Sequence, residues 1–255
     1  MDKIKVKILN PDIIKETKDL MVLGARITQQ SHKLKSFEDF EKMYNKPYGD
    51  TFLKTINNLP HPTLLHFTKI NIIVFGASRR FLAQITRHQD NVKFMSGSLQ
   101  YSNYKDFSNF VVPYNIMNTL EESKYLASCR ESMENYKNLN ESNIPHDECG
   151  YCAPQGLRNV LLISATPFEL KHMIAQRICR RNTSETRYVM LKIWDELYKI
   201  APDIFTAKTT GCFCMQDKCK EGHFSCKQCI IETTPSDILR KDFPLIYNNQ
   251  KEVNA

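Results

Sequence analysis

Two adjacent segments, residues 168–178 and 184–200, carry the strongest helical periodicity in the chain. In the first pattern the apolar positions recur at helical spacing, and Arg177 and Arg181 fall in the same stripe, which should face the core. Arginine seldom lies in a core without an anionic partner. Two interpretations therefore stay open. One is an ion pair, internal or between subunits, with Glu185 as a candidate partner; the other is a polar or anionic ligand held by both arginines.

Strand-like and helical segments alternate along the rest of the chain. Residues 1–8 alternate lysines with apolar side chains, and residues 67–75 are rich in β-branched and aromatic residues, so both are expected to be strands. Ser36 and Asp39 have the spacing of a capping box, and Ser78 is placed to cap the helix after the second strand. Helices are expected at residues 12–23, 37–44, 52–59, 79–88 and 120–138.

The chain is expected to form one main domain with a small element appended to it. No internal repeat or low-complexity tract interrupts residues 1–206, which are therefore expected to form a single domain of helices and strands. Five of the nine cysteines lie within residues 211–229, so residues 207–235 are expected to form a small Cys-rich element. Residues 236–255 are predicted to be a loose tail.

Composition excludes several classes of protein. Of the 255 residues, 42% are hydrophobic and 25% charged, which is typical of a globular domain. The longest apolar run, residues 70–77, is far shorter than the roughly 20 residues that span a membrane. The N-terminal segment lacks the apolar stretch of a secretory signal, so a cytoplasmic protein is expected. A net charge of +7 suits an anionic partner, although the chain has no Gly-rich phosphate loop.

Polar side chains gather on one surface of the helix expected after Ser78. Arg80, Gln84, Arg87 and His88 follow one another at spacings of one to four, so they form a compact basic patch. A solvated basic face is the simpler interpretation. The residues directly after the patch supply serine, glycine, glutamine and tyrosine groups, which favours a nucleotide-binding surface instead.

The cysteines indicate either reduced, packed thiols or a metal site. An odd number of cysteines cannot pair completely, and a chain without an export signal is not expected to carry a disulfide framework. Zn²⁺ takes four nitrogen or sulfur ligands, and the Cys-rich element can supply them. The candidate metal ligands are Cys214, Cys219, Cys226 and Cys229.

The segment that begins at Arg87-His88-Gln89 resembles the signature of the flavin-dependent thymidylate synthases. That signature is an Arg-His-Arg triplet, seven further residues, a serine and, shortly afterwards, Arg-Tyr; here eight residues precede Ser98, and Gln100-Tyr101 follows. The resemblance covers about residues 20–226. Its other parts are residues 24–28 and 61–63, the spacing of Arg177, Cys179, Glu185 and Arg187, and the Cys-bearing extension of one branch at residues 211–226.

The resemblance implies an α+β fold with a mixed sheet flanked by helices, and a homotetramer whose active sites are shared between subunits. It implies that FAD binds through the signature and that a methyl group is transferred to C5 of dUMP. Methylenetetrahydrofolate would supply the carbon and NADPH would reduce the flavin. In this scheme no side chain is a covalent nucleophile, and the protein orients and polarises the pyrimidine.

Carried over residue by residue, the resemblance implies three groups of site residues. Arg177 would polarise the pyrimidine as the catalytic residue. The substrate would be bound by Gln84, Ser96, Ser98 and Gln100. The flavin would be bound by Thr28, His61, Thr63, Arg87, His88, Gln89 and Arg181.

Three cationic groups of the family pattern are missing, because Gln89, Gln100 and Gly150 stand where the family has arginines. A second interpretation therefore keeps the fold and the flavin but changes the acceptor or the carbon unit, for example to hydroxymethylation of a pyrimidine deoxynucleotide. A third interpretation, from another class, is a zinc-bearing nucleic-acid-binding protein. It ranks below the others because the arginine-containing helices lie outside the Cys-rich element, so nucleic acid is not the expected partner.

Overall fold

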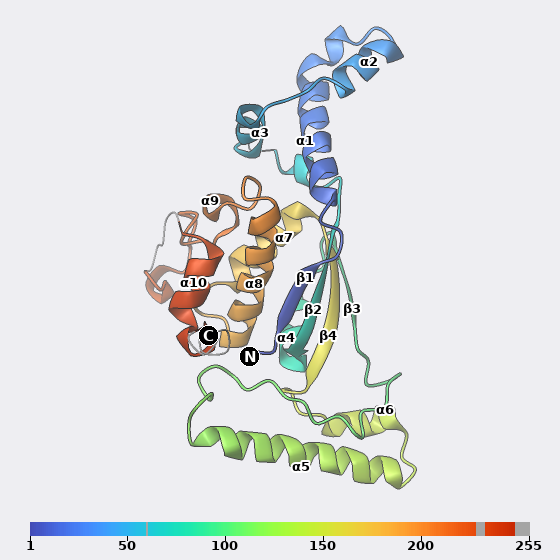
Figure 1. The fold of residues 1–255 in the computed structure, drawn as a ribbon, viewed down its shortest axis with the longest axis vertical. Coiled ribbons are helices and arrows are strands. Elements are labelled where there is room, and N and C mark those ends of the chain that lie inside the picture. The colour runs from blue at the N-terminus through green and yellow to red at the C-terminus, as the bar shows by residue number, and fades with distance from the viewer. Residues whose placement is uncertain (60, 228–232, 248–255) are drawn as a thin grey trace, which may run out of the picture.

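A four-stranded antiparallel sheet lies at the centre of the computed structural model, which describes residues 1–59, 61–227 and 233–247 (Figure 1). The strand order is β1-β2-β4-β3, and all three pairings are antiparallel. The α+β class expected from the sequence is confirmed, but the sheet is antiparallel and not mixed. The strands are β1 (Lys5–Ile8), β2 (Ile70–Ser78), β3 (Val92–Ser96) and β4 (Arg158–Ala165).

Helices cover one face of this sheet. α8 (Ser184–Ile200) packs on β1 and β2, with α4 (Arg79–Ile85) and α7 (Pro167–Arg177) beside it (Figure 1). The helix predicted at residues 184–200 is confirmed, and its Met190, Trp194 and Leu197 are fully buried. The Trp194 indole donates a 2.8 Å hydrogen bond to the Phe205 carbonyl, which satisfies its polar group inside the core.

The other face of the sheet presents apolar side chains that are partly exposed. Phe75 on β2 is opposite Val160 on β4, and Leu162 is opposite both Ile73 and Met95. Because residues two apart on a strand share a face, all five side chains lie on this second face. Phe75 is 58% exposed, Met95 73% and Val160 39%. This apolar sheet face, which Lys5 and Lys7 border on β1, is the kind of surface that marks a site of protein association.

Further helices extend the molecule beyond both ends of the sheet (Figure 1). At one end lie α1 (Ile13–Gln30), α2 (Phe37–Tyr44) and α3 (Asp50–Asn57), with the short helices η1 (Ser31–Lys33) and η2 (Pro62–Leu65). α5 (Glu121–Glu141), α6 (His146–Cys149) and η3 (Gly150–Cys152) lie at the opposite end. The short helices α9 (Ala207–Thr210) and η4 (Gly222–Phe224) follow α8 along the chain.

Local sequence explains how α1 and α2 are held. Arg26 is buried on α1 and donates hydrogen bonds to the carbonyls of Met43, Lys46 and Pro47, which fixes the end of α2 against α1. Ser36 and the side chain of Asp39 form the predicted capping box of α2. The helix predicted at residues 12–23 extends further, to Gln30, than its sequence pattern indicated.

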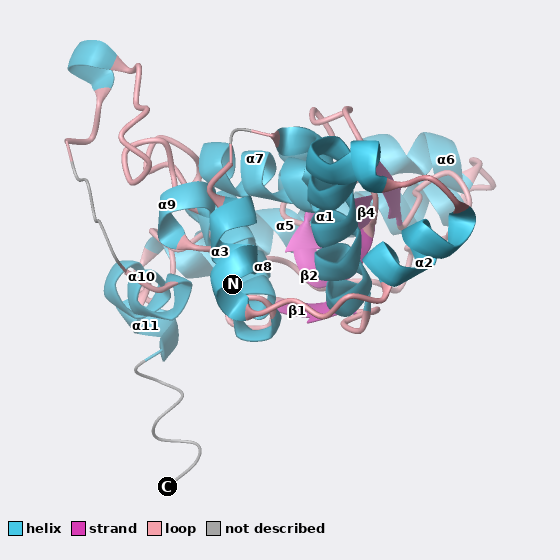
Figure 2. Ribbon diagram, turned by 90° about the horizontal axis from the view of Figure 1, so that it is seen from above, coloured by secondary structure: helices cyan, strands magenta, loops and turns pink. Residues whose placement is uncertain are grey.

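The prediction of a loose tail is wrong for residues 236–247. α10 (Pro235–Asp242) packs on α8, and α11 (Pro244–Tyr247) packs on α10 (Figure 2). Phe243, between them, is buried, and its ring centroid lies 5.1 Å from that of Tyr114 and 5.2 Å from that of Tyr188. Residues 248–255 lie outside the described residues. Within the described part of the chain, no helix has the length and apolar character needed to cross a membrane.

Replacing Phe243 tests whether α10 and α11 belong to the folded domain. Phe243→Ala should lower the free energy of unfolding by about 3–5 kcal/mol, because a fully buried aromatic side chain is lost. Leu245→Ala is the matched control and should cost much less, since Leu245 is 39% exposed. Urea unfolding of both variants measures the difference. Equal, small losses would mean that residues 235–247 contribute little to the fold.

Candidate active site

Three side chains from two helical regions meet at the end of α4. His88 lies three residues beyond the end of α4, Glu169 lies in the first turn of α7, and Arg177 is the last residue of α7. Arg177 Nε donates to His88 Nε2 at 3.0 Å, and His88 Nδ1 lies 3.3 Å from a Glu169 carboxylate oxygen. His88 and Glu169 are both buried. We call these residues the His88 network.

The network fixes the protonation state of the imidazole. Because Nε2 accepts from Arg177, the ring proton lies on Nδ1 and is directed at Glu169. Burial and the nearby Arg177 charge lower the pKa of His88 to about 4, so the ring is neutral at physiological pH. Burial raises the pKa of Glu169 to about 7. A neutral histidine therefore orients the guanidinium of Arg177.

His172 lies close to the network and raises the question of a metal site. A ring nitrogen of His172, a ring nitrogen of His88 and a carboxylate oxygen of Glu169 lie within 4.8 Å of one another. Both nitrogens of His88 are engaged, one by Arg177 and one by Glu169. A cation beside the ring also disfavours a metal ion. The group is therefore better described as a hydrogen-bond network than as a metal centre.

Arg177 and Arg181 have different surroundings, which corrects the expectation of a shared stripe. α7 ends at Arg177, so Arg181 lies in the turn that follows and is exposed. Arg181 pairs with Glu221 and not with Glu185. Arg177 is half-buried, and burial together with the charge of Arg87 lowers its pKa. Both arginines line a pocket of about 710 Å³.

A second pocket, of about 430 Å³, lies between η2 and α7. It is lined by His61, His172 and Lys171, together with Lys208 and Lys218. Lys171 is only 8% exposed and has no ion-pair partner among the described residues. Burial lowers the pKa of Lys171 to about 8. We call this the lysine pocket, and its donors suit an anionic ligand.

A third pocket, of about 410 Å³, collects the polar residues at the end of β3. Three of the four residues predicted to bind substrate line it: Ser96, Ser98 and Gln100. Ser98 Oγ accepts from the backbone N–H of Gln100 at 3.1 Å, which shapes the loop. Arg79 supplies a cation to this pocket, and Asp147 and Gly150 also line it. We call it the β3 pocket.

The remaining predicted residues lie on the surface around these pockets. Gln84 is half-exposed on α4, and Arg87 and Gln89 are exposed just beyond it. Thr28 is exposed on α1, where its hydroxyl donates to the Ala25 carbonyl, and Thr63 is exposed on η2. One chain thus does not enclose all predicted flavin and substrate residues in a single cavity.

α4 separates two of these regions. Arg79, in the β3 pocket, begins α4, and the His88 network lies beyond its other end. The seven residues of α4 span roughly 10 Å at about 1.5 Å per residue. Residues that the resemblance assigns to one substrate site therefore lie at opposite ends of a helix within one chain.

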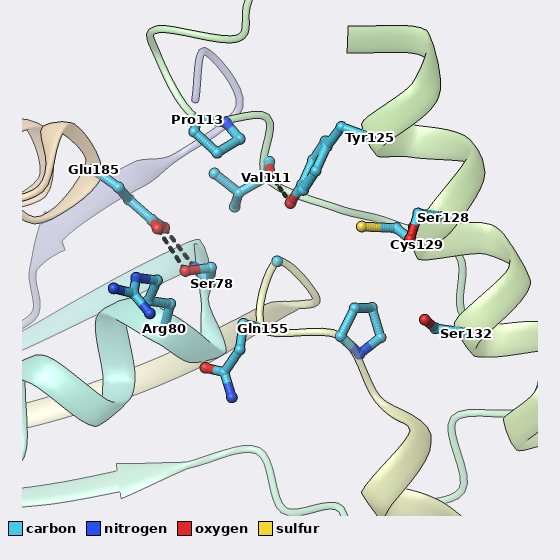
Figure 3. Close-up of a pocket in the computed structure, with 12 residues that line it drawn as sticks. Ser78, Arg80, Val111, Pro113, Tyr125, Ser128, Cys129, Ser132, Gln155 and Glu185 are labelled. Atoms are coloured by element: carbon cyan, nitrogen blue, oxygen red, sulfur yellow. Dashed lines mark hydrogen bonds between the residues drawn. The ribbon is translucent and has the colours of Figure 1, made fainter. Parts of the chain in front are cut away.

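A buried carboxylate holds the start of α4. Glu185 accepts hydrogen bonds from the backbone N–H of Ser78 at 2.7 Å and from its hydroxyl at 2.5 Å (Figure 3). The same hydroxyl caps α4 by accepting from Phe81 N–H at 3.1 Å, as the sequence predicted for Ser78. Burial raises the pKa of Glu185. The small pocket in Figure 3, which Arg80 and Tyr125 also line, adjoins this contact.

The cysteines occupy two separate regions. Cys149 and Cys152 lie in a small apolar cluster against α5. Cys214, Cys219 and Cys226 line the pocket that contains Arg177. Cys229, the fourth predicted metal ligand, lies outside the described residues.

The sequence did not single out Arg79, Glu169, Lys171 or His172. Glu169 and His172 are three positions apart on α7, and Glu169 lies two turns before Arg177. This spacing places both polar side chains on the helix that ends at Arg177. The helical periodicity of residues 168–178 could therefore have identified them as candidates. Lys171 carried no such signal, because its burial depends on α3 and on the segment after α8, which are distant in the sequence.

Comparison with known proteins identifies the family to which the chain belongs. A family model described as "Thymidylate synthase complementing protein" matches residues 12–203. The flavin-dependent thymidylate synthase of Thermococcus onnurineus is 27% identical over 193 residues, which are 72% of this chain and 78% of that protein. The corresponding protein of Pyrococcus abyssi is 27% identical over 168 residues, 64% of this chain and 68% of that protein.

Solved structures share the fold. Thymidylate Synthase X from Helicobacter pylori, solved with FAD and dUMP, has a TM-score of 0.60 at 18% identity and covers 80% of this chain and 97% of that one. The UMP/dUMP methylase PolB from Streptomyces cacaoi, bound with 5-Br dUMP, has a TM-score of 0.60 at 15% identity, covering 81% and 95%. The family match, the relatives and the fold agree, and the chain belongs to the thymidylate synthase complementing protein family, the enzymes named flavin-dependent thymidylate synthases.

Proposed function

We propose that the protein is an FAD-dependent enzyme that methylates C5 of dUMP, with methylenetetrahydrofolate as carbon donor and NADPH as reductant. The observation that carries this proposal is the position of Arg177. Its Nε is fixed by a neutral His88, and in the described part of the chain its terminal nitrogens have no hydrogen-bond partner. They are free to donate to a pyrimidine oxygen, the role that the family resemblance implies.

The donors of this chain fit an FAD molecule. The lysine pocket holds a buried cation, Lys171, without an ion-pair partner among the described residues, and His61 lines the same pocket. A diphosphate would supply the missing negative charge. When bound, FAD supplies the redox chemistry of the reaction. We assign the anionic part of FAD to this pocket and its other contacts to Thr28, Thr63, Arg87, Gln89 and Arg181. His88, predicted as a flavin contact, has both ring nitrogens engaged and would act through Arg177 instead.

The chain's own residues bind, orient and polarise the nucleotide. Gln84 and the β3 pocket residues Ser96, Ser98 and Gln100 would hold the nucleotide by hydrogen bonds, and Arg79 adds a cation near them. Arg177 stabilises negative charge that develops on the pyrimidine ring. Glu169 holds the tautomer of His88, and His88 in turn holds Arg177. Glu169 is therefore a positioning residue.

We also propose that the site is completed by a second copy of the chain, in a homotetramer. The β3 pocket and the His88 network lie at opposite ends of α4 in one chain, so a partner chain would be needed to bring the two groups to one nucleotide. The apolar sheet face offers a surface for this association, because Phe75, Met95 and Val160 are partly exposed on it.

A second candidate function changes the acceptor or the carbon unit. Asp147 and Gly150 line the β3 pocket beside Gln100, so this pocket contains a carboxylate and a single cation, Arg79. A carboxylate repels a nucleotide phosphate, and this favours an acceptor other than dUMP or a rearranged phosphate position. Hydroxymethylation of a pyrimidine deoxynucleotide remains the example to test.

Product analysis distinguishes these functions. The purified protein is incubated with FAD, NADPH, methylenetetrahydrofolate and a mixture of dUMP, dCMP and their nucleosides, and products are identified by mass spectrometry. A gain of one methyl group on dUMP is expected. Another acceptor or mass change would support the second candidate. A protein that gives no product and retains no flavin would contradict both and favour the nucleic-acid-binding interpretation.

Arg177→Ala should lower turnover by roughly 10²–10³-fold, because one donor to the developing charge is lost. The absorbance of the bound flavin should persist, since other residues carry most flavin contacts. Arg180→Ala is the matched control, because Arg180 pairs with Asp242 and lies outside the network. If the Arg177→Ala variant turned over as fast as the Arg180→Ala variant, the proposed role of Arg177 would be contradicted.

The His88 network predicts a titration. The NMR signal of the His88 ring should change near pH 4, because protonation breaks the hydrogen bond that Nε2 accepts from Arg177. Arg177→Gln should move this pKa upward toward 6.5, because it removes the positive charge of Arg177, which lowers the pKa of His88. Arg180→Gln should leave it unchanged. Between pH 6.5 and 4 the unfolded chain binds a proton that folded His88 does not, so this group destabilises the fold as the pH falls.

The sheet-face assembly is tested by Phe75→Glu. Light scattering after size exclusion should show the wild-type protein as a tetramer and the variant as smaller species, because a charge would be buried in the interface. Phe37→Glu is the control, since Phe37 is 68% exposed on α2, away from the sheet. A variant that assembles like the wild type would rule out this face.

A further inference from the structure

The pocket that contains Arg177 carries more positive charge than the proposed function uses, and we call it the Arg177 pocket. Its volume of about 710 Å³ lies within the range of about 300–1,000 Å³ that is typical of small-molecule sites. The cations Arg177, Arg181, Lys218 and Lys220 line it, together with the carboxylate of Glu221. In the part of the chain that the structure describes, the cysteines of this pocket do not bring three ligand atoms close enough for one metal ion. The cations therefore indicate the ligand of this pocket, and the cysteines do not.

Two of these cations lack an anionic partner. Arg181 pairs with Glu221. Lys218 and Lys220 line the pocket and are exposed, and neither forms an ion pair within the residues that the structure describes. An ammonium group binds a carboxylate or a phosphate by a charge-assisted hydrogen bond. The unpaired charge at the opening of the pocket therefore suits an anionic group that extends toward solvent.

The Arg177 pocket adjoins the lysine pocket. Phe213 and Lys218 line both, so these two side chains form part of the wall between them. The backbone N–H of Lys218 donates to the Phe213 carbonyl at 2.7 Å, which fixes the turn that carries both residues. The space thus lies beside the arginine assigned to the pyrimidine and beside the pocket assigned to FAD. A carbon donor has to reach the same region, so the rest of that molecule needs a path out of it.

The chemistry of the carbon donor fits this path. One end of methylenetetrahydrofolate delivers the carbon, and the other end is a glutamate, to which cellular folates add further glutamates through γ-amide bonds. Each added glutamate carries one carboxylate, so the negative charge is spread along a chain. Lys218 and Lys220 are separate point charges on an exposed segment and match such a chain. The phosphates of NADPH concentrate their charge, and a Gly-rich loop or an arginine fork suits them better.

We propose that Lys218 and Lys220 bind the γ-glutamate tail of the folate co-substrate and make the protein selective for polyglutamylated folates. The inference rests on the proposed function for the identity of the carbon donor and extends it to a tail-binding site. Both lysines lie beyond residues 12–203, which the family model matches, so the family match does not assign them. Glu221 opposes this binding, because its carboxylate repels the tail and pairs with Arg181.

A titration without turnover tests the proposal. The full-length, FAD-loaded protein is titrated by calorimetry, in the absence of oxygen, with tetrahydrofolate that carries one or five γ-linked glutamates. This ligand lacks the carbon that is transferred, so binding alone is measured. The pentaglutamate should bind about tenfold more tightly, since each exposed ion pair contributes roughly two- to fivefold in affinity. The preference should shrink as the ionic strength rises from about 0.05 M to about 0.5 M, because salt screens exposed charges.

Neutral substitutions assign the preference to the two lysines. Lys220→Gln and Lys218→Gln should each reduce it by about two- to fivefold. The absorbance of bound flavin is measured alongside, because Lys218 also lines the lysine pocket. Lys227→Gln is the matched control and should keep the full preference, because Lys227 is exposed on the same segment but does not line the pocket. Glu221→Gln should have the opposite effect and increase the preference, because it removes a carboxylate and releases Arg181.

Three results would overturn the proposal. The first is equal affinity of the wild-type protein for the two folates. The second is a preference that persists when Lys218 and Lys220 are replaced together. The third is a loss of NADPH affinity in these variants with folate affinity unchanged, which would assign the lysines to a phosphate.

The titration also separates this inference from the proposed function. Methyl transfer to dUMP combined with equal folate affinities would overturn the tail-binding site and leave the proposed function intact. A tail preference that depends on both lysines, in a protein that forms no product, would support the site and contradict the reaction alone. Circular dichroism verifies that each variant is folded.

Discussion

The contact between Glu185 and Ser78 positions most of the candidate site. A buried carboxylate on α8 accepts two hydrogen bonds from the residue that joins β2 to α4 (Figure 3). Removing one partner of a buried charged contact is costly, so the junction has little freedom to shift. Arg79 begins α4 and His88 follows it, so this junction sets the direction of the helix that places both residues.

The helices that carry the site were predictable because their signals are local. The pattern at 184–200 and the cap at Ser78 need only neighbouring residues, and both are confirmed. β3 was missed, since residues 92–96 were interpreted as part of a ligand-binding segment and their pairing with β4 is long-range. The helix at 235–242 was missed despite a local signal, a capping box between Thr234 and Asp237.

The site was predictable as a set of residue types but not as a set of contacts. Arg177 and His88 were each selected from sequence, and the structure brings them within 3.0 Å. Arg181 was grouped with Arg177 because helical periodicity was extended past the true end of α7. Glu169 escaped attention because a single glutamate in a helix has no distinguishing pattern. Its role depends on burial, which comes from tertiary packing.

The missing arginines of the family pattern have a partial replacement. A charge-assisted hydrogen bond contributes roughly 1.5–3 kcal/mol, so two lost phosphate contacts would weaken nucleotide binding on the order of a hundredfold or more. Arg79 lines the β3 pocket beside Gln100 and Gly150 and restores one positive charge there. The negative charge of Asp147 in the same pocket opposes the positive charge of Arg79. Under the proposed function, the charge of this pocket would bear on the choice of acceptor, whereas the His88 network would act on the pyrimidine ring.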